Sequence, residues 1–276
     1  MERKAIIITG ASDGIGAAAA KRLSADGHNV VIVGRSPSKT EAVARELGTD
    51  FYLADFARLS DVCWLADELL EKYPRIDVLA NNAGAIFGSE RQVTPNGHEF
   101  TFQVNYLASF LLTTRLLDRL RKSLATVIFT SSIGNSVFGN MDINDLENEK
   151  NYRPTKAYGN SKLAQILFAR ELHRRYGYRG LAAVAFHPGN IASNFSSEPG
   201  SVFQLLYHTP FRNLWTASPE KGADTLIFLA EGEPGVDFPS GEYFVKRKVA
   251  KPNKQANDPD LARELWNRSE VMIRGF

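Results

Sequence analysis

The sequence has very little cysteine and no long hydrophobic run. Its single cysteine, Cys63, excludes an internal disulfide and permits a reducing compartment, so we expect a cytoplasmic protein. No apolar stretch reaches the roughly 18 residues that a transmembrane helix needs. The first strand-like segment starts at Ala5, so we expect neither a signal peptide nor an N-terminal anchor.

Positive and negative side chains are almost equal in number. The chain has 33 lysines and arginines against 31 aspartates and glutamates, a net charge of +2, and no run of five basic residues. We therefore expect no nucleic-acid partner, although the charge balance alone argues neither way. The histidines are not paired at ligand spacing, so we expect no metal site. They are His28, His98, His173, His187 and His208.

Strand-like and helix-like segments alternate along the 276 residues. Short apolar runs predict strands at 5–8, 29–33, 50–53, 76–80, 125–129, 181–186 and 243–245. Breaker-free stretches predict helices at 15–23, 38–47, 59–72, 97–122, 156–176 and 258–273. This alternation predicts an α/β fold: a single-domain, doubly wound parallel sheet (Rossmann fold) over residues 1–276. Two segments, 134–155 and 194–218, are irregular and break the alternation.

A glycine-rich turn joins the first predicted strand to the first predicted helix. Gly10, Gly14 and Gly16 have the spacing Gly-x3-Gly-x-Gly, which differs from the common dinucleotide fingerprint Gly-x-Gly-x-x-Gly. Backbone N–H groups and the positive end of a helix would meet there, which suits a diphosphate. A glycine turn without a ligand is the alternative.

Tyr158 and Lys162 are four residues apart in a predicted helix and therefore share one face. An ammonium beside a phenol lowers the phenol pKa from about 10 toward neutrality, so the pair could exchange a proton with an alcohol or carbonyl. A solvated surface pair is the alternative. Tyr152 and Lys156 have the same spacing, but Pro154 between them disfavours a continuous helix, so we interpret Tyr152 as loop packing.

Polar residues follow two predicted strands at their carboxyl ends, the edge where open α/β sheets bind ligands. Ser131 and Ser132 follow one strand, where a hydroxyl either bonds a substrate carbonyl or caps the turn. Asn81-Asn-Ala-Gly84 follows another, where its amides either bond a cofactor or tie strand ends together. Asn105 is a polar residue inside a long apolar helix, and most such residues are structural.

Together with Pro188-Gly189, these motifs resemble the short-chain dehydrogenase/reductase superfamily over nearly the whole chain. The phrases at 158–164 and 187–190 are similar to its retinol-dehydrogenase-like branch and to the catalytic part of the WW-domain-containing oxidoreductase. The resemblance implies that Tyr158 is the acid/base and that Lys162 lowers its pKa and holds the nicotinamide ribose. It also implies that Ser132 polarises the carbonyl and that Asn105 positions a water in a proton relay.

The end of the second predicted strand indicates which nicotinamide cofactor binds. An acidic residue there would accept hydrogen bonds from a ribose 2′-OH, but the chain has Gly34 followed by Arg35, with Ser36 and Lys39 beyond. A guanidinium can hold a 2′-phosphate, so we predict NADP(H) in preference to NAD(H), with Asp13 opposing that preference.

The resemblance assigns further cofactor contacts. Asp55 corresponds to the acid that contacts adenine, with a helix N-cap as the alternative. Ile191 would offer its backbone to the carboxamide, and Ser193 replaces a threonine that contacts the cofactor. The remaining contacts implied are Gly10, Ser12, Asp13, Gly14, Ile15, Gly16, Phe56, Asn82, Ala83, Gly84, Tyr158, Lys162, Pro188 and Gly189.

These features predict an oxidoreductase that transfers a hydride between NADP(H) and a bulky hydrophobic carbonyl or alcohol of retinoid, steroid or polyketide type. Relatives carry a substrate lid where this chain has the aromatic-rich segment 194–218, and an apolar lid suits such a substrate. A packing helix and a peripheral membrane contact are alternatives for that segment. A catalytically silent NADP(H) sensor is the alternative function. The helix 156–176 also predicts a homodimer through a stripe that core packing explains in part: Leu163, Ile166, Leu167 and Ala169.

Overall fold

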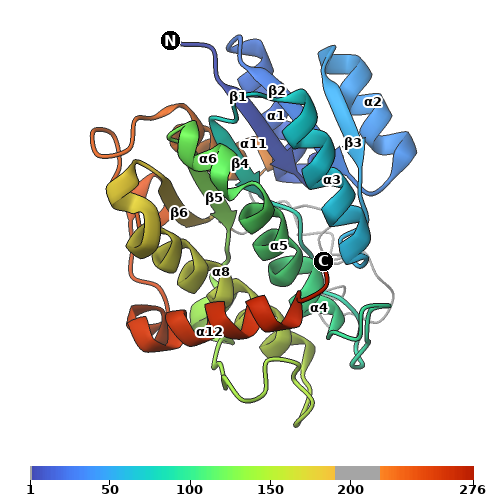
Figure 1. Ribbon diagram of the computed structural model, residues 1–276, viewed down its shortest axis with the longest axis vertical. Coiled ribbons are helices and arrows are strands. Elements are labelled where there is room, and N and C mark those ends of the chain that lie inside the picture. Colours follow the sequence, from blue (N-terminus) through green and yellow to red (C-terminus); the bar gives the residue numbers. More distant parts are fainter. Residues whose placement is uncertain (1, 190–217) are drawn as a thin grey trace.

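A twisted eight-stranded sheet forms the centre of the protein in the computed structural model, which describes residues 2–189 and 218–276 (Figure 1). The strand order is β3-β2-β1-β4-β5-β6-β7-β8. The first seven strands run parallel, and β8 pairs antiparallel with β7. The strands are β1 (Ala5–Thr9), β2 (Asn29–Gly34), β3 (Asp50–Leu53), β4 (Val78–Asn81), β5 (Thr126–Thr130), β6 (Ala182–His187), β7 (Tyr243–Val245) and β8 (Lys248–Val249).

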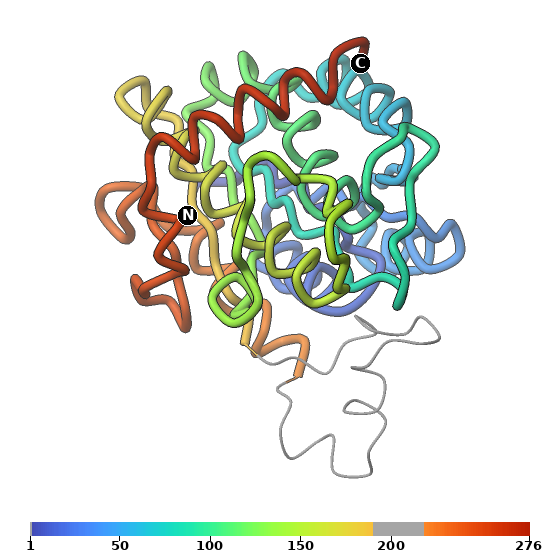
Figure 2. The backbone as a smooth tube through the Cα atoms, turned by 90° about the horizontal axis from the view of Figure 1, so that it is seen from below, coloured from blue at the N-terminus to red at the C-terminus, as the bar shows by residue number. Residues whose placement is uncertain are grey.

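Helices cover both faces of this sheet, which confirms the predicted doubly wound α/β fold. The helices are α1 (Gly14–Ala25), α2 (Pro37–Leu47), α3 (Leu59–Lys72), α4 (Phe100–Phe102), α5 (Ala108–Arg115), α6 (Leu117–Lys122), α7 (Gly134–Val137), α8 (Pro154–Tyr176), α11 (Pro219–Glu231) and α12 (Pro259–Met272). Figure 1 shows α3, α5 and α8 in front of the sheet and α1 and α11 behind it. In Figure 2, α12 (red) lies outermost on the α5–α8 layer.

Alternate side chains of β1 enter different hydrophobic cores. Ile7 packs into the core shared with α3, α5 and α8, whereas Ile6 and Ile8 pack into the core shared with α1 and α11. All three isoleucines are fully buried. A strand covered on both faces has no polar side to expose, which explains the continuous apolar run in the sequence.

The predicted helical stretch 97–122 starts at Phe100 and is interrupted, so the prediction of one long helix is wrong. Gly97 lies outside it with a φ of 87°, and α4 begins only after Glu99, whose carboxylate accepts from the N–H groups of Thr101 and Phe102. A π-helical turn, η1 (Gln103–Leu107), follows, and the helix breaks again at Leu116 between α5 and α6. Most residues from Thr101 to Thr113 are buried, so this stretch has no exposed face whose periodicity could reveal the widened turn.

Other elements differ from the expectation in detail. The irregular segment 134–155 contains the short helix α7, and β8 and α11 were not predicted. Ser218 caps α11 and Pro219 occupies its first turn, a start signal that the aromatic-rich segment before it obscured. Helix α8 begins at Pro154, so Tyr152 lies outside it as predicted. The predicted lid lies outside the described residues except for Ser218.

Within residues 2–189 and 218–276, no helix is both long and apolar enough to cross a membrane. The same ranges hold no group of three or more histidine, cysteine, aspartate or glutamate side chains placed to bind a metal ion.

Candidate active site

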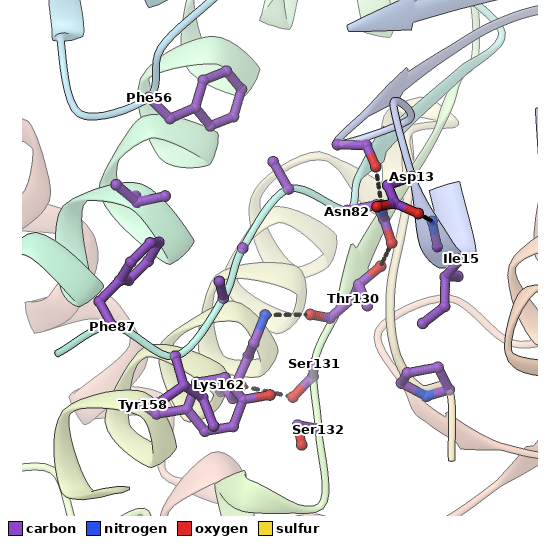
Figure 3. Close-up of a pocket in the computed structure, with 18 of the residues that line it drawn as sticks. Asp13, Ile15, Phe56, Asn82, Phe87, Thr130, Ser131, Ser132, Tyr158 and Lys162 are labelled. Atoms are coloured by element: carbon purple, nitrogen blue, oxygen red, sulfur yellow. Dashed lines mark hydrogen bonds between the residues drawn. The ribbon is translucent and has the colours of Figure 1, made fainter. Parts of the chain in front are cut away.

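A pocket of about 450 Å³ lies at the carboxyl ends of the parallel strands, the edge predicted to bind a ligand (Figure 3). Figure 3 shows Tyr158, Lys162 and Ser132 together at one end of this pocket and Asp13 at another. The predicted residues that line it are Gly10, Ser12, Asp13, Gly14, Ile15, Arg35, Lys39, Asp55, Phe56, Asn82, Ala83, Gly84, Ser132, Tyr158, Lys162, Pro188 and Gly189. Gly16, Ser36 and Asn105 lie outside the lining, and Ile191 and Ser193 lie outside the described residues.

The glycine turn at 10–16 packs too closely for side chains. A β-carbon on Gly10 would lie 2.7 Å from Cα of Ala83, and one on Gly16 would lie 2.4 Å from the Gly10 carbonyl oxygen. Gly10 and Gly14 also have positive φ angles of 66° and 56°, which glycine adopts without strain. The turn therefore brings the N-terminus of α1 against the pocket, where the positive end of the helix favours an anion.

Asp13 has two partners at this turn. Its Oδ1 accepts from the Gly14 N–H at 2.7 Å, and its Oδ2 accepts from Lys39 Nζ at 3.0 Å. Both charged side chains are about half exposed, so this ion pair adds little stability. The ion pair matters for the charge of the pocket, which Arg35 also lines, because Lys39 offsets the negative charge of Asp13 there.

Asn82 ties three strand ends together. Its Nδ2 donates to the carbonyl oxygens of Thr9 at 3.0 Å and Gly10 at 3.2 Å, and its Oδ1 accepts from the Thr130 hydroxyl at 3.1 Å. The side chain thus joins the ends of β1, β4 and β5, which is one of the two roles considered for this motif. Asp55 does not cap α3 as its alternative role required, because Arg58 occupies that position and Asp55 accepts from the Ala57 N–H.

Tyr158 and Lys162 lie one turn apart on α8, as their spacing predicted. Both side chains are buried, and Lys162 Nζ lies 5.7 Å from the centre of the Tyr158 ring. Lys162 Nζ donates to the Thr130 carbonyl oxygen at 2.8 Å. Burial lowers the pKa of Lys162 to about 7. The ammonium therefore changes protonation near neutral pH while it is held against the end of β5.

The two serines after β5 point to different environments. Ser131 is buried, and its hydroxyl donates to the Lys162 carbonyl oxygen at 2.8 Å, which joins β5 to α8. Ser132 lines the pocket, and its Oγ accepts from the Gly134 N–H at 3.1 Å. Since that bond occupies an acceptor site, the Ser132 O–H proton is available to donate to a substrate oxygen.

Gly134 lies close to both Ser132 and Tyr158. A β-carbon on Gly134 would lie 2.9 Å from Tyr158 Cε1 and 3.5 Å from Ser132 Oγ. The absence of a side chain at 134 therefore lets the tyrosine ring and the serine hydroxyl approach the same place.

Asn105 lies behind the pocket wall and is fully buried. Its Oδ1 accepts from the Ala85 N–H and its Nδ2 donates to the Ala85 carbonyl oxygen, both at 2.9 Å. Nδ2 also donates to Ser161 Oγ at 3.1 Å. A β-carbon on Gly84 would lie 2.8 Å from Asn105 Oδ1 and 3.2 Å from Lys162 Nζ, so Gly84 lies close to both side chains. The role of Asn105 in positioning a water stays a prediction.

Sequence reasoning did not name the apolar part of the pocket or its histidine. The pocket is lined by Ile86, Phe87, Ile133 and Phe138. The first two follow one residue after the Asn-Ala-Gly motif, a signal that could have indicated them. His187 also lines it, and its Nδ1 accepts from the Ile133 N–H at 3.3 Å. Burial lowers the pKa of His187 to about 4, so the imidazole is neutral at physiological pH.

Known proteins are similar to this chain in both sequence and fold. The sequence profile of the short chain dehydrogenases matches residues 4–201. The chain belongs to the short-chain dehydrogenase/reductase family. It is therefore an oxidoreductase that uses a nicotinamide cofactor.

The relatives of this short-chain dehydrogenase match it along nearly its whole length. A protein of Streptomyces sp. (strain C5), whose name provisionally assigns it daunorubicin C-13 ketoreductase activity, is 39% identical over 98% of this chain and 92% of its own length. Retinol dehydrogenase 14 of Homo sapiens is 35% identical over 99% of this chain and 87% of its own length. A crystal structure of an uncharacterised protein from Mycobacterium Paratuberculosis has 29% identity and a TM-score of 0.77, covering 98% of this chain and 92% of that one.

The pocket of this short-chain dehydrogenase has the features that a nicotinamide dinucleotide needs. The N-terminus of α1 offers N–H groups for the diphosphate, and Arg35 lies at the end of β2 where one ribose would be held. Lys162 Nζ lies at the opposite end beside Tyr158. One continuous pocket thus connects the glycine turn at 10–16 to Tyr158 and Lys162.

Proposed function

We propose that the protein is an NADP(H)-dependent carbonyl reductase or alcohol dehydrogenase for bulky hydrophobic substrates. One observation supports this proposal above the others. Ser132, Tyr158 and Lys162 meet at one end of a single pocket that also reaches Arg35 and Lys39. Acid/base groups and a site for a charged cofactor phosphate are thereby combined in one cavity.

The side chains divide the chemistry of the substrate oxygen between them. When bound, the nicotinamide cofactor supplies the hydride that adds to the substrate carbon in reduction. Tyr158 donates a proton to the substrate oxygen in reduction and removes it in oxidation, while the Ser132 hydroxyl donates a hydrogen bond to the same oxygen. The Lys162 ammonium stabilises the tyrosinate that remains after proton donation.

The charges at the end of β2 support the proposed preference for NADP(H) over NAD(H). Gly34 offers no carboxylate to accept from a ribose 2′-OH, whereas Arg35 and Lys39 line the pocket there. A guanidinium binds a phosphate through paired, charge-assisted hydrogen bonds. Asp13 opposes a phosphate less than its charge suggests, because Lys39 contacts it at 3.0 Å.

The lining near Tyr158 supports a bulky hydrophobic substrate. Ile86, Phe87, Ile133 and Phe138 present large apolar side chains to the pocket. Two relatives are named for daunorubicin and for retinol, so a polyketide-like ketone and a retinoid are the first compounds to test, followed by steroids. The lid at 194–218 stays a prediction.

Several expectations about partners and location accompany this proposal and stay predictions. We expect a cytoplasmic protein that binds no nucleic acid, with peripheral membrane contact as an alternative, and we expect a homodimer. The α8 stripe does not support that dimer, because its side chains are core residues with at most 1% exposure. They are Leu163, Ile166, Leu167 and Ala169.

Oxidation of NADPH and NADH by the purified protein tests the proposal, with a panel of bulky ketones and aldehydes. Tyr158→Phe should abolish turnover and still bind NADPH. Tyr152→Phe is the matched control, because Tyr152 precedes α8 and is not among the lining residues. Tight NADPH binding with no turnover on the whole panel would instead support the cofactor-sensing alternative.

A further inference from the structure

Gln165 lies between Lys162 and Asn105 and contacts both. It is on α8, one turn after Lys162, and it is fully buried. Its Nε2 donates to the Asn105 carbonyl oxygen at 2.7 Å, and its Oε1 accepts from Lys162 Nζ at 3.4 Å. A continuous polar chain therefore runs from the lysine to the π-helical turn that carries Asn105.

The partners of Gln165 determine which way its amide points. Asn105 offers a carbonyl oxygen, which only accepts, and Lys162 offers an ammonium, which only donates. A flipped amide would place oxygen against oxygen and NH2 against the ammonium. The observed orientation is therefore the only one in which both contacts are hydrogen bonds.

We propose that Gln165 is a positioning residue that joins Lys162 to Asn105 through its side-chain amide and aims the ammonium into the pocket. Lys162 Nζ has three protons. The Thr130 carbonyl oxygen takes one and Gln165 Oε1 takes a second, so the third is left for the pocket. At 3.4 Å, the contact to Gln165 is the longer of these two hydrogen bonds.

This arrangement gives Asn105 a direct link to Lys162. The family resemblance assigns Asn105 a water in a proton relay, whereas here the Asn105 backbone carbonyl accepts from a protein side chain that itself contacts the lysine. An amide passes on a hydrogen bond but does not exchange protons as water does. Gln165 therefore orients Lys162 and preserves its charge, and it leaves proton delivery to groups on the pocket side of the lysine.

The inference rests on the proposed function only for the catalytic use of Lys162, so its test is made on the protein without substrate. Burial is the cause that lowers the pKa of Lys162 below its ordinary value, and Tyr158 is the titratable side chain beside it. Between about pH 7 and 10.5, the Lys162 side chain is protonated in the unfolded chain and mostly neutral in the folded protein. The free energy of unfolding therefore rises with pH through this range, starting near pH 7.

Gln165→Met keeps the size of the side chain and removes both hydrogen bonds. The variant leaves the Thr130 carbonyl oxygen as an acceptor but removes Gln165 Oε1, so the pKa of Lys162 should fall further. The onset of the rise in stability should then move down by about one pH unit, measured as unfolding free energy against pH with Lys162→Met as the baseline.

Asn160→Leu is the matched control. Asn160 is also buried on α8 and makes two side-chain hydrogen bonds, to the Asn140 N–H at 2.9 Å and to Asn148 Oδ1 at 3.3 Å. Neither bond involves Lys162, so this variant should lose stability at all pH values and keep the onset. An onset in Gln165→Met that matches the wild type would overturn the proposal, whatever the substrate proves to be.

A second measurement needs no Gln165 variant to fold. In the wild type labelled with ¹⁵N at glutamine side chains, one buried amide resonance should titrate with an apparent pKa of about 7. The same resonance should be independent of pH in Lys162→Met. A spectrum in which no glutamine amide follows the Lys162 titration would contradict the contact.

Discussion

The Thr40 hydroxyl lies where a β-carbon on Gly34 would have to go. An ideal Cβ at Gly34 would be 2.1 Å from Thr40 Oγ1, and that hydroxyl is itself held by a 2.7 Å bond to the Ser36 carbonyl oxygen. Thr40 is fully buried and β-branched, so it cannot move aside freely. The end of β2 therefore has no room for the carboxylate side chain that would favour NAD.

Gly34→Asp should consequently destabilise the protein before it changes the cofactor preference. We expect a loss of about 1–3 kcal/mol in unfolding free energy from overpacking. Adding Thr40→Ala removes the nearest clashing atom and leaves only the Ser12 β-carbon at 3.0 Å, so the double variant should recover most of the lost stability and gain NADH affinity. Unfolding curves and cofactor titrations, with Thr40→Ala alone as control, measure both effects. A Gly34→Asp protein as stable as the wild type would show that the Thr40 contact is not restrictive.

Arg35→Asp should move the cofactor preference from NADPH toward NADH. Loss of a charge-assisted contact to a phosphate corresponds to about 10- to 100-fold weaker NADPH binding, and the new carboxylate can accept from a ribose 2′-OH. Dissociation constants for both cofactors check this. Arg45→Asp, on the same side of the sheet in α2 and outside the pocket, should leave the ratio unchanged. An unaltered ratio of the two dissociation constants in Arg35→Asp would show that Arg35 does not determine the cofactor preference.

Gly134→Ala should slow catalysis and leave cofactor binding intact. The new methyl group would lie 2.9 Å from Tyr158 Cε1, so the ring must shift from its present position beside the Ser132 hydroxyl. A displacement of this kind costs up to about 100-fold in kcat. Ser136→Ala, on the exposed side of the same short helix, is the control. Equal kcat values in the wild type and Gly134→Ala would mean that the ring position is not critical.

His187 predicts a pH dependence of stability in the acid range. Its folded-state pKa is about 4, below the ordinary 6.5, so the unfolded chain binds more protons between these values. Stability should therefore rise with pH across that window and be lost as the pH falls toward 4. His187→Gln keeps an acceptor for the Ile133 N–H without titrating there, and should flatten this part of the curve. His173→Gln controls for the loss of an imidazole on the surface.

The sequence allowed the sheet, most helices and the placement of Tyr158 beside Lys162 to be predicted, because each depends on local pattern. Tyr158 and Lys162 share a helix face through their spacing alone. The contact between Gly34 and Thr40, by contrast, depends on how α2 packs after β2, and no periodicity encodes it. Gln165 could have been suspected, since it is three residues after Lys162, but its partner Asn105 is 60 residues away in the chain.

The π-helical turn at Gln103–Leu107 makes the chain sensitive to its own length at this point. Each residue of a helix rotates the next by about 100°, so one deletion here would turn either Asn105 or the buried face of α5 away from its partners. Substitutions in this stretch change single contacts, whereas insertions and deletions change the direction of everything that follows. Among natural variants of this protein, we expect amino-acid substitutions between Gly97 and Arg115 but no insertions or deletions there.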